Sequence, residues 1–138
     1  MKLKRIVTMF ILGGMLSLSC AGMAYAKTTK KQVDLESNDG KITAVGTLAA
    51  DFTWLTGKGT GGAETAINGD SDEEGRIFVS LFAINKKNEI VYSETKRADF
   101  YGQTSVKKLK CKKFTSYHQI LNANDRPIGT KRSLSVSD

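Results

Sequence analysis

The chain has 138 residues, of which 21 are Lys or Arg and 14 are Asp or Glu, so its formal net charge is +7. Hydrophobic residues make up 40% of it, as in an ordinary folded protein. This length and composition exclude a multidomain machine, a collagen-like chain, a coiled coil and a polytopic membrane protein. They do not identify a function.

The first 26 residues have the order of a secretory signal peptide. Three basic residues lie within positions 1–5, residues 6–18 are largely apolar, and Ala24-Tyr25-Ala26 supplies the small residues that signal peptidase reads. We therefore predict cleavage after this tripeptide, a secreted, extracellular protein of bacterial type, and no stable membrane span after cleavage. The alternatives are a retained anchor and lipid attachment at Cys20, for which the preceding Ser17-Leu18-Ser19 is a poor match.

Residues 27–138 are predicted to form a single exported domain. Removing residues 1–26, which hold three basic residues and no acid, leaves 112 residues with 18 basic and 14 acidic side chains. This part keeps one cysteine, Cys111, so no internal disulfide is available and a hydrophobic core must stabilise the domain. We expect Cys111 to be a small buried apolar residue, and a reactive or intermolecularly paired thiol is the alternative.

The mature part alternates between strand-like segments and turns. After a short, flexible basic tail at residues 27–31, we expect strands at residues 32–36, 42–48, 76–85, 89–96, 104–114, 116–122 and 129–136. Turn residues separate several of them, at 38–40, 86–88 and 122–127. Since no segment has a helical apolar stripe, the sequence predicts an all-β fold, an antiparallel β-sandwich or small barrel of about seven or eight short strands.

The segment Arg76 to Asn85, RIFVSLFAIN, is the strongest strand signal in the chain. Apolar residues occupy both of its faces, which is typical of a central strand. From this pattern we expect Phe78 and Phe82 to be buried between the two sheets.

A glycine-rich run follows Trp54 and formally matches a dinucleotide-binding pattern. Residues 57–62 read Gly-Lys-Gly-Thr-Gly-Gly, but residues 63–68 are too short to supply the helix that would receive a pyrophosphate. We interpret the run as a mobile loop and predict no cofactor.

The segment from Asn68 to Glu74 offers oxygen ligands at alternate positions, as in a calcium loop. Glu73 stands where an EF-hand needs Gly, and Val79 stands where it needs Glu, so an EF-hand is excluded. We interpret the segment as a solvated turn, with an improvised calcium site as the alternative, and we assign no metal site.

Enzymatic motifs are missing from the sequence. His118 is its single histidine, and no Gly-x-Ser-x-Gly elbow accompanies it. On a strand, His118 shares a face with Ser116 and Ile120, so a structural role is the default. We therefore predict that the protein is not an enzyme, with a Cys111–His118 hydrolase as the residual alternative.

Two aromatic pairs lie near predicted strand ends, Phe52 with Trp54 and Phe100 with Tyr101. We expect these rings to plug the ends of the sandwich. If they were exposed together, they would instead form a contact patch for a carbohydrate or a protein.

The most biased segment is Val106 to Phe114, VKKLKCKKF. As one strand it would place Lys108, Lys110 and Lys112 in a row on one face, with Lys107 and Lys113 near the ends of the other. These five lysines are our candidate polyanion-binding residues. The alternative is an edge strand whose lysines prevent aggregation.

Charge is also divided along the sequence. Residues 27–75 have a net charge of −4 and residues 76–138 a net charge of +8. In a two-sheet fold such a division predicts an acidic end and a basic face, and it favours anionic partners.

The export signal, the small size and the segment Ser116-Tyr117-His118 make the chain similar, over a handful of residues, to small exported β-sandwich bacteriocins of the lactococcin 972 type. The resemblance transfers no functional residue. The sequence thus predicts a secreted, non-enzymatic protein that binds an anionic cell-envelope polymer or another protein at the cell surface, and not nucleic acid in vivo. The alternative is a secreted bacteriocin or toxin-like protein that acts on other cells.

Overall fold

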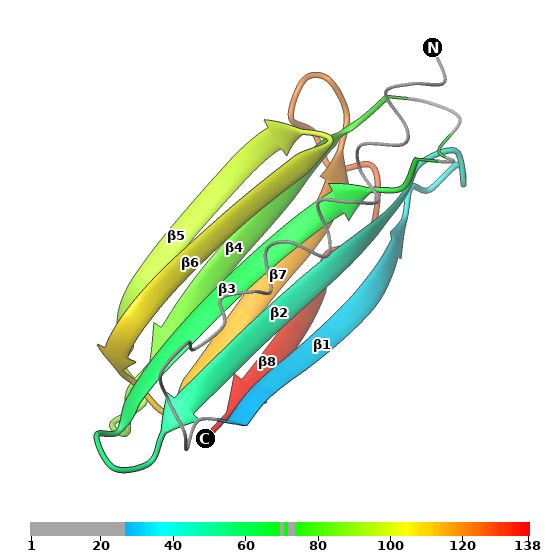
Figure 1. Cartoon of the computed structure of the whole chain (residues 1–138). Helices are drawn as coiled ribbons and strands as arrows, with labels where there is room; N and C mark the ends of the chain where they lie inside the picture. The colour runs from blue at the N-terminus through cyan, green and yellow to red at the C-terminus, as the bar shows by residue number, and fades with distance from the viewer. Residues whose placement is uncertain (1–26, 70, 72–73) are drawn as a thin grey trace.

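The computed structural model describes residues 27–69, 71 and 74–138 (Figure 1). The predicted signal peptide, residues 1–26, lies outside the described residues. The described residues form eight strands: β1 (Lys27–Glu36), β2 (Thr43–Thr53), β3 (Lys58–Ile67), β4 (Arg76–Ile84), β5 (Ile90–Asp99), β6 (Tyr101–Lys110), β7 (Lys113–Leu121) and β8 (Arg132–Ser137).

These strands make two four-stranded antiparallel sheets that face each other. One sheet has the order β1-β2-β3-β6 and the other β5-β4-β7-β8. The chain changes sheet between β3 and β4, between β5 and β6 and between β6 and β7, as can be followed in Figure 1. The predicted all-β sandwich is confirmed.

A continuous apolar core lies between the sheets. Alternate residues of β2, β4 and β7 point into it, because successive side chains of a strand point to opposite faces. Its largest fully buried apolar side chains are those of Phe114, Ile42, Leu48, Ile77, Leu81 and Ile120.

The two phenylalanines of β4 do not lie in this core, so the prediction for Phe78 and Phe82 is wrong. Ile77 and Leu81, on the other face of the strand, are fully buried. Phe78 lies on the outer face, 5.4 Å from the Arg97 guanidinium carbon, and Phe82 packs edge-on against the Tyr117 ring at 5.7 Å. Both faces of β4 are apolar, so local pattern does not identify the inner one.

The glycine-rich run is also not a loop: residues 58–67 form β3, an interior strand of the first sheet. Gly59 and Gly61 face Phe114 of the opposite sheet, where Cβ atoms would lie 2.8 Å and 2.6 Å from its ring carbons. The glycines make room for a large ring between the sheets.

Several strand boundaries differ from those predicted, and two of these differences change how a segment is interpreted. Residues 27–31 are part of β1 and pair with residues 48–52 of β2, so they are not a free tail. The segment 104–114 is not one strand, because β6 ends at Lys110 and the link Cys111-Lys112 leads into β7 in the other sheet.

The predicted turns are confirmed. Gly40, Asn88 and Asp125 have φ angles of 72°, 65° and 59°, in the left-handed region that Gly, Asn and Asp adopt most readily. These residues lie in the β1–β2, β4–β5 and β7–β8 connections.

Candidate binding site at one end of the sandwich

Three connections that are distant in sequence meet at one end of the sandwich. They are the β2–β3 turn at residues 54–57, the β4–β5 turn at residues 85–89 and the β6–β7 link at residues 111–112. Antiparallel pairing brings them together because β2, β4 and β6 all end there. A shallow hollow of about 460 Å³ lies among the three, with lining residues contributed by each.

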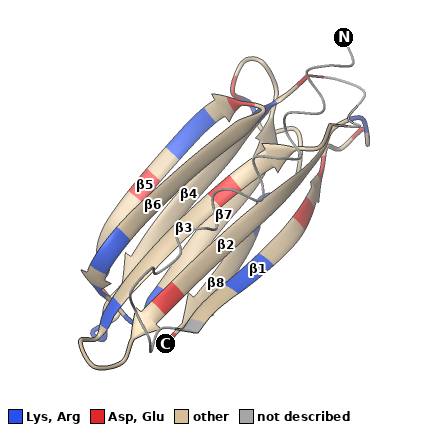
Figure 2. Ribbon diagram, in the orientation of Figure 1, with Lys and Arg blue, Asp and Glu red and all other residues tan. Residues whose placement is uncertain are grey.

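Several lysines lie in or next to these three connections. Lys86, Lys87 and Lys110 line the hollow, and Lys58 pairs with Lys110 across β3 and β6. Lys112 joins them, since its backbone N–H donates to the carbonyl of Ile84 at the end of β4 (2.8 Å). We call Lys58, Lys86, Lys87, Lys110 and Lys112 the lysine-rich end. Figure 2 shows basic residues at the end of β6 and in the turns beside it.

The acidic groups at this end do little to balance the lysines. The carboxylate of Glu89 accepts a hydrogen bond from the Asn85 side-chain amide (2.8 Å), and Asp138 lies near Lys112, to whose carbonyl its backbone N–H donates (2.8 Å). The five lysines therefore lie close to Glu89 and Asp138, with buried Asp51 two residues before the end of β2, so that positive charge is in excess.

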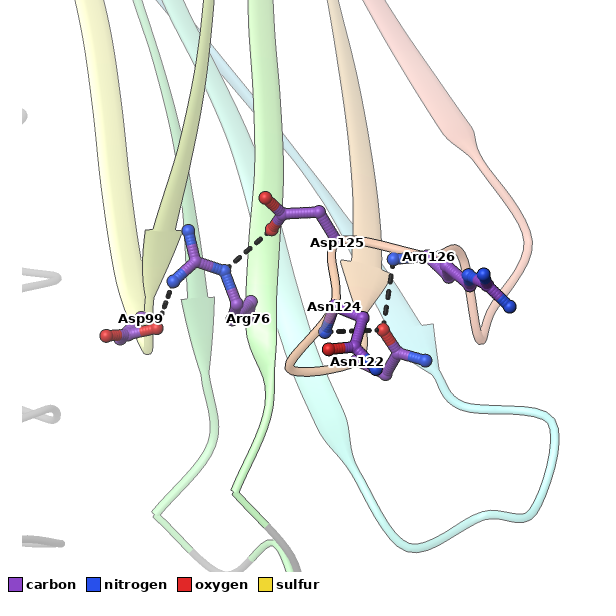
Figure 3. A network of polar contacts seen from close by, with 6 residues as sticks. All are labelled: Arg76, Asp99, Asn122, Asn124, Asp125 and Arg126. Atoms are coloured by element: carbon purple, nitrogen blue, oxygen red, sulfur yellow. Dashed lines mark hydrogen bonds and ion pairs between the residues drawn. The ribbon is translucent and has the colours of Figure 1, made fainter.

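A network of paired charges lies at the opposite end of the sandwich. There the Arg76 guanidinium donates to Asp99 (2.6 Å) and to Asp125 (2.7 Å), joining the start of β4 to the end of β5 and to the β7–β8 turn (Figure 3). In the same turn the Asn122 side chain accepts the backbone N–H groups of Asn124 and Arg126 (2.9 and 3.0 Å). Glu36, Asp39 and Glu74 also lie at this end, which agrees with the acidic end predicted from the sequence.

The five lysines singled out from the sequence do not form one row. Lys107 and Lys108 are exposed where β6 is irregular, since Lys108 has a φ of 54° and the β3–β6 register shifts between Gly59 and Gly61. Only Lys110 and Lys112 of that set belong to the lysine-rich end. Lys113 is half-buried at the start of β7.

Sequence reasoning missed Lys58, Lys86 and Lys87 as members of the site. The pair Lys86-Lys87 was recognisable as a turn, but nothing local indicates that this turn meets the end of β6. The edge-strand interpretation is supported in part, because β6 does lie at the edge of its sheet.

The aromatic pairs separate in the structure. Phe52 packs against Phe114 with ring centroids 5.6 Å apart, as expected for a ring that closes the core. Trp54 does not plug the end, since 67% of its surface is exposed, and neighbouring Leu55 is 65% exposed. Phe100 lies at the opposite end of the sandwich, so the two pairs form no common patch.

His118 is fully buried between the sheets. Its Nδ1 lies 2.7 Å from the Thr65 hydroxyl and its Nε2 2.7 Å from the Ser116 hydroxyl. Thr65 donates its own proton to the Phe78 carbonyl (3.3 Å), so Nδ1–H is the donor to Thr65 and Nε2 accepts from Ser116. Burial lowers the pKa of His118 to about 4, which keeps the ring neutral.

The Cys/His pair that a hydrolase would need is not assembled. Cys111 is buried beside Gly59, whereas His118 packs against Gly46. Cys111 precedes β7, and the six strand residues from Lys113 to His118 alone span ~17 Å. Burial also raises the pKa of the Cys111 thiol, which opposes formation of the nucleophilic thiolate.

Within residues 27–69, 71 and 74–138, no group of three or more His, Cys, Asp or Glu side chains is placed to hold a metal ion. Asp70, Asp72 and Glu73, from the calcium-loop alternative, lie outside the described residues. The same part of the chain contains no helix long and apolar enough to cross a membrane.

Comparisons with known proteins identify no family. No protein-family model matches the chain, and no curated protein matches it. Two solved structures of a glycosyl hydrolase family 2 member from Bacteroides cellulosilyticus are similar to it, each at 9% sequence identity over 80% of this chain, with TM-scores of 0.36 and 0.35. The match covers 14% and 13% of those chains, so this chain spans about a seventh of their length, and their activity is not transferred to it.

Proposed function

We propose that this protein is an exported, non-enzymatic β-sandwich that binds an anionic polymer of the cell envelope through its lysine-rich end. The observation that carries the proposal is that Lys86, Lys87 and Lys110 line one shallow hollow. Lys58 and Lys112 lie beside it, as the cross-strand partner of Lys110 and the hydrogen-bond partner of Ile84. Of the two partners considered from the sequence, a polymer and a protein, this observation favours the polymer.

The physical argument concerns charge density. Like charges held close together repel one another. A bound polyanion reduces this repulsion and releases the mobile counterions, which favours binding. The hollow is shallow and open, which suits a flexible chain with repeated phosphates or carboxylates better than a small molecule that must be enclosed. Binding should therefore be multivalent, sensitive to salt and indifferent to the order of units in the polymer.

The test compares two variants of equal net charge. Lys86→Gln/Lys87→Gln/Lys110→Gln removes three charges from the lysine-rich end, and Lys30→Gln/Lys31→Gln/Lys96→Gln removes three exposed charges from β1 and β5. Binding to immobilised polyphosphate is measured against salt concentration. By analogy with nucleic-acid binding, the first variant should lower the log–log salt slope by ~2–3, and the control should lower it much less.

Equal slopes for the two variants would mean that only overall charge matters, and the proposed site would be wrong. A third variant, Lys107→Gln/Lys108→Gln, addresses the edge-strand interpretation. If those two lysines protect the edge of β6, this variant scatters more light on storage while its polyphosphate binding stays close to that of the wild type.

A further inference from the structure

The β2–β3 turn presents two large apolar side chains to solvent. Trp54 and Leu55 are 67% and 65% exposed, more than any other large hydrophobic residue of the described chain. Hairpin turns normally carry Gly, Asn, Asp, Pro or Ser. An exposed Trp-Leu pair at a turn tip therefore points to a contact that the isolated protein does not make.

The backbone of this turn is held in place. The N–H groups of Thr56 and Gly57 both donate to the Thr53 carbonyl, at 3.2 and 2.9 Å, and the N–H of Lys58 donates to the Thr56 hydroxyl at 3.3 Å. Gly57 supplies the φ of 63° that closes the turn. Backbone N–H groups that are already hydrogen-bonded within the turn lose less hydration free energy when the tip leaves water.

The apolar tip and the lysine-rich end are parts of one surface. Thr56 and Gly57, which follow the tip, line the same hollow as Lys86, Lys87 and Lys110. A Trp with an apolar body and an N–H donor is suited to the boundary between lipid tails and headgroups. Lysines beside it are suited to the negative headgroups, where each contributes on the order of a fivefold gain in binding.

We propose that the lysine-rich end, besides binding a polymer, docks on the surface of an anionic lipid bilayer, with Trp54 and Leu55 entering the headgroup boundary. This inference rests on the proposed function, because it uses the same lysines. A soluble polyanion neutralises the lysines but offers nothing to the apolar tip. A neutral bilayer accepts the tip but leaves the lysines without counter-charges. An anionic bilayer satisfies both, and the binding is peripheral because the tip is two residues long.

The sequence contains one tryptophan, so the fluorescence of the exported protein reports on Trp54 directly. The probe is a vesicle of equal parts phosphatidylcholine and phosphatidylglycerol, compared with a vesicle of phosphatidylcholine alone and with soluble polyphosphate. We expect the emission maximum to move to shorter wavelength with the anionic vesicle. Polyphosphate and the neutral vesicle should leave it unchanged. Bound anionic vesicles without a shift would overturn the inference.

Vesicle co-sedimentation of variants separates the two proposals. Trp54→Ser/Leu55→Ser should bind anionic vesicles on the order of tenfold or more weakly and retain polyphosphate binding. Phe100→Ser removes an exposed ring at the opposite end and should bind as the wild type does. Equal sedimentation of the tip variant and the wild type would overturn the inference but leave the proposed function standing. If Lys86→Gln/Lys87→Gln/Lys110→Gln instead keeps both kinds of binding, the proposed function itself fails.

Discussion

Gly61 of β3 lies directly against Phe114 of β7: a Cβ atom on Gly61 would be 2.6 Å from Cδ1 of the ring. Two more ring carbons would be within 2.8 Å, so rotation of the ring does not relieve the overlap. The contact joins the two sheets and explains why a glycine-rich segment is an interior strand. Phe114 fills the space that the missing side chains leave, and it is completely buried.

Gly61→Ala should destabilise the fold by ~1–3 kcal/mol, because the added methyl overpacks a closed core. Urea denaturation of variant and wild type measures the loss. The double variant with Phe114→Leu is the control. Its total loss should be smaller than the sum of the two single losses, because the smaller side chain makes room for the methyl. If Gly61→Ala were as stable as the wild type, the close packing of Gly61 against Phe114 would be contradicted.

The two faces of β4 and β7 should respond differently to truncation. Phe114→Ala empties a fully buried site and should cost ~3–5 kcal/mol. Phe82→Ala removes a half-buried ring that packs edge-on against Tyr117, and should cost ~1–2 kcal/mol. Denaturation midpoints at constant m-value give both figures. Equal losses of stability in the two variants would indicate that Phe82 is buried in the core.

His118 should make the protein less stable in acid. Its pKa is lowered from 6.5 to about 4 by burial, so between these values the unfolded chain binds more protons than the folded one. Stability contributed by the neutral ring is complete above about pH 6.5 and is lost as the pH falls toward 4, by ~3 kcal/mol in all. The raised pKa of Glu64 acts in the opposite direction, since its protonation favours the folded state.

NMR of the histidine ring in the wild type tests this directly. The His118 ring signals should stay constant between pH 8 and pH 5, whereas a free histidine titrates near 6.5. In the variant His118→Gln, the loss of stability on acidification from pH 6.5 should be smaller. A midpoint near 6.5 in the folded wild type would show that the ring is accessible and charged.

Cys111 should react slowly with thiol reagents. The side chain is 5% exposed and burial raises the pKa of the thiol, so both access and thiolate fraction are low. Labelling with Ellman's reagent at neutral pH should be slower by on the order of tenfold or more than in denaturant. A rate equal to that of the denatured chain would place the thiol at the surface.

Export should remove residues 1–26. The small residues of Ala24-Tyr25-Ala26 suit signal peptidase, and β1 begins at the next residue, Lys27. The intact mass of the exported protein decides this prediction. A chain that begins at an acylated Cys20 would show that lipoprotein processing operates instead.

Local sequence patterns were sufficient to predict the β4 strand and three of the turns. β4 is apolar throughout, and Gly40, Asn88 and Asp125 lie at the left-handed positions of their connections. These features depend on residues that are neighbours in sequence, and period-two alternation and turn chemistry describe such neighbours well. The all-β class and burial of Cys111 were likewise predictable, and the structure confirms both, whereas export stays a prediction.

Tertiary structure decided what depends on distant residues. Ile77 rather than Phe78 faces inward because of how the sheets pack, and Gly61 is in a strand because Phe114, 53 positions later, needs its space. The candidate site has the same origin. Lys58, Lys86 and Lys110 meet because antiparallel strands return three connections to one end of the sandwich. Strand pairing joins residues far apart in the chain, and no local periodicity records which ends will meet.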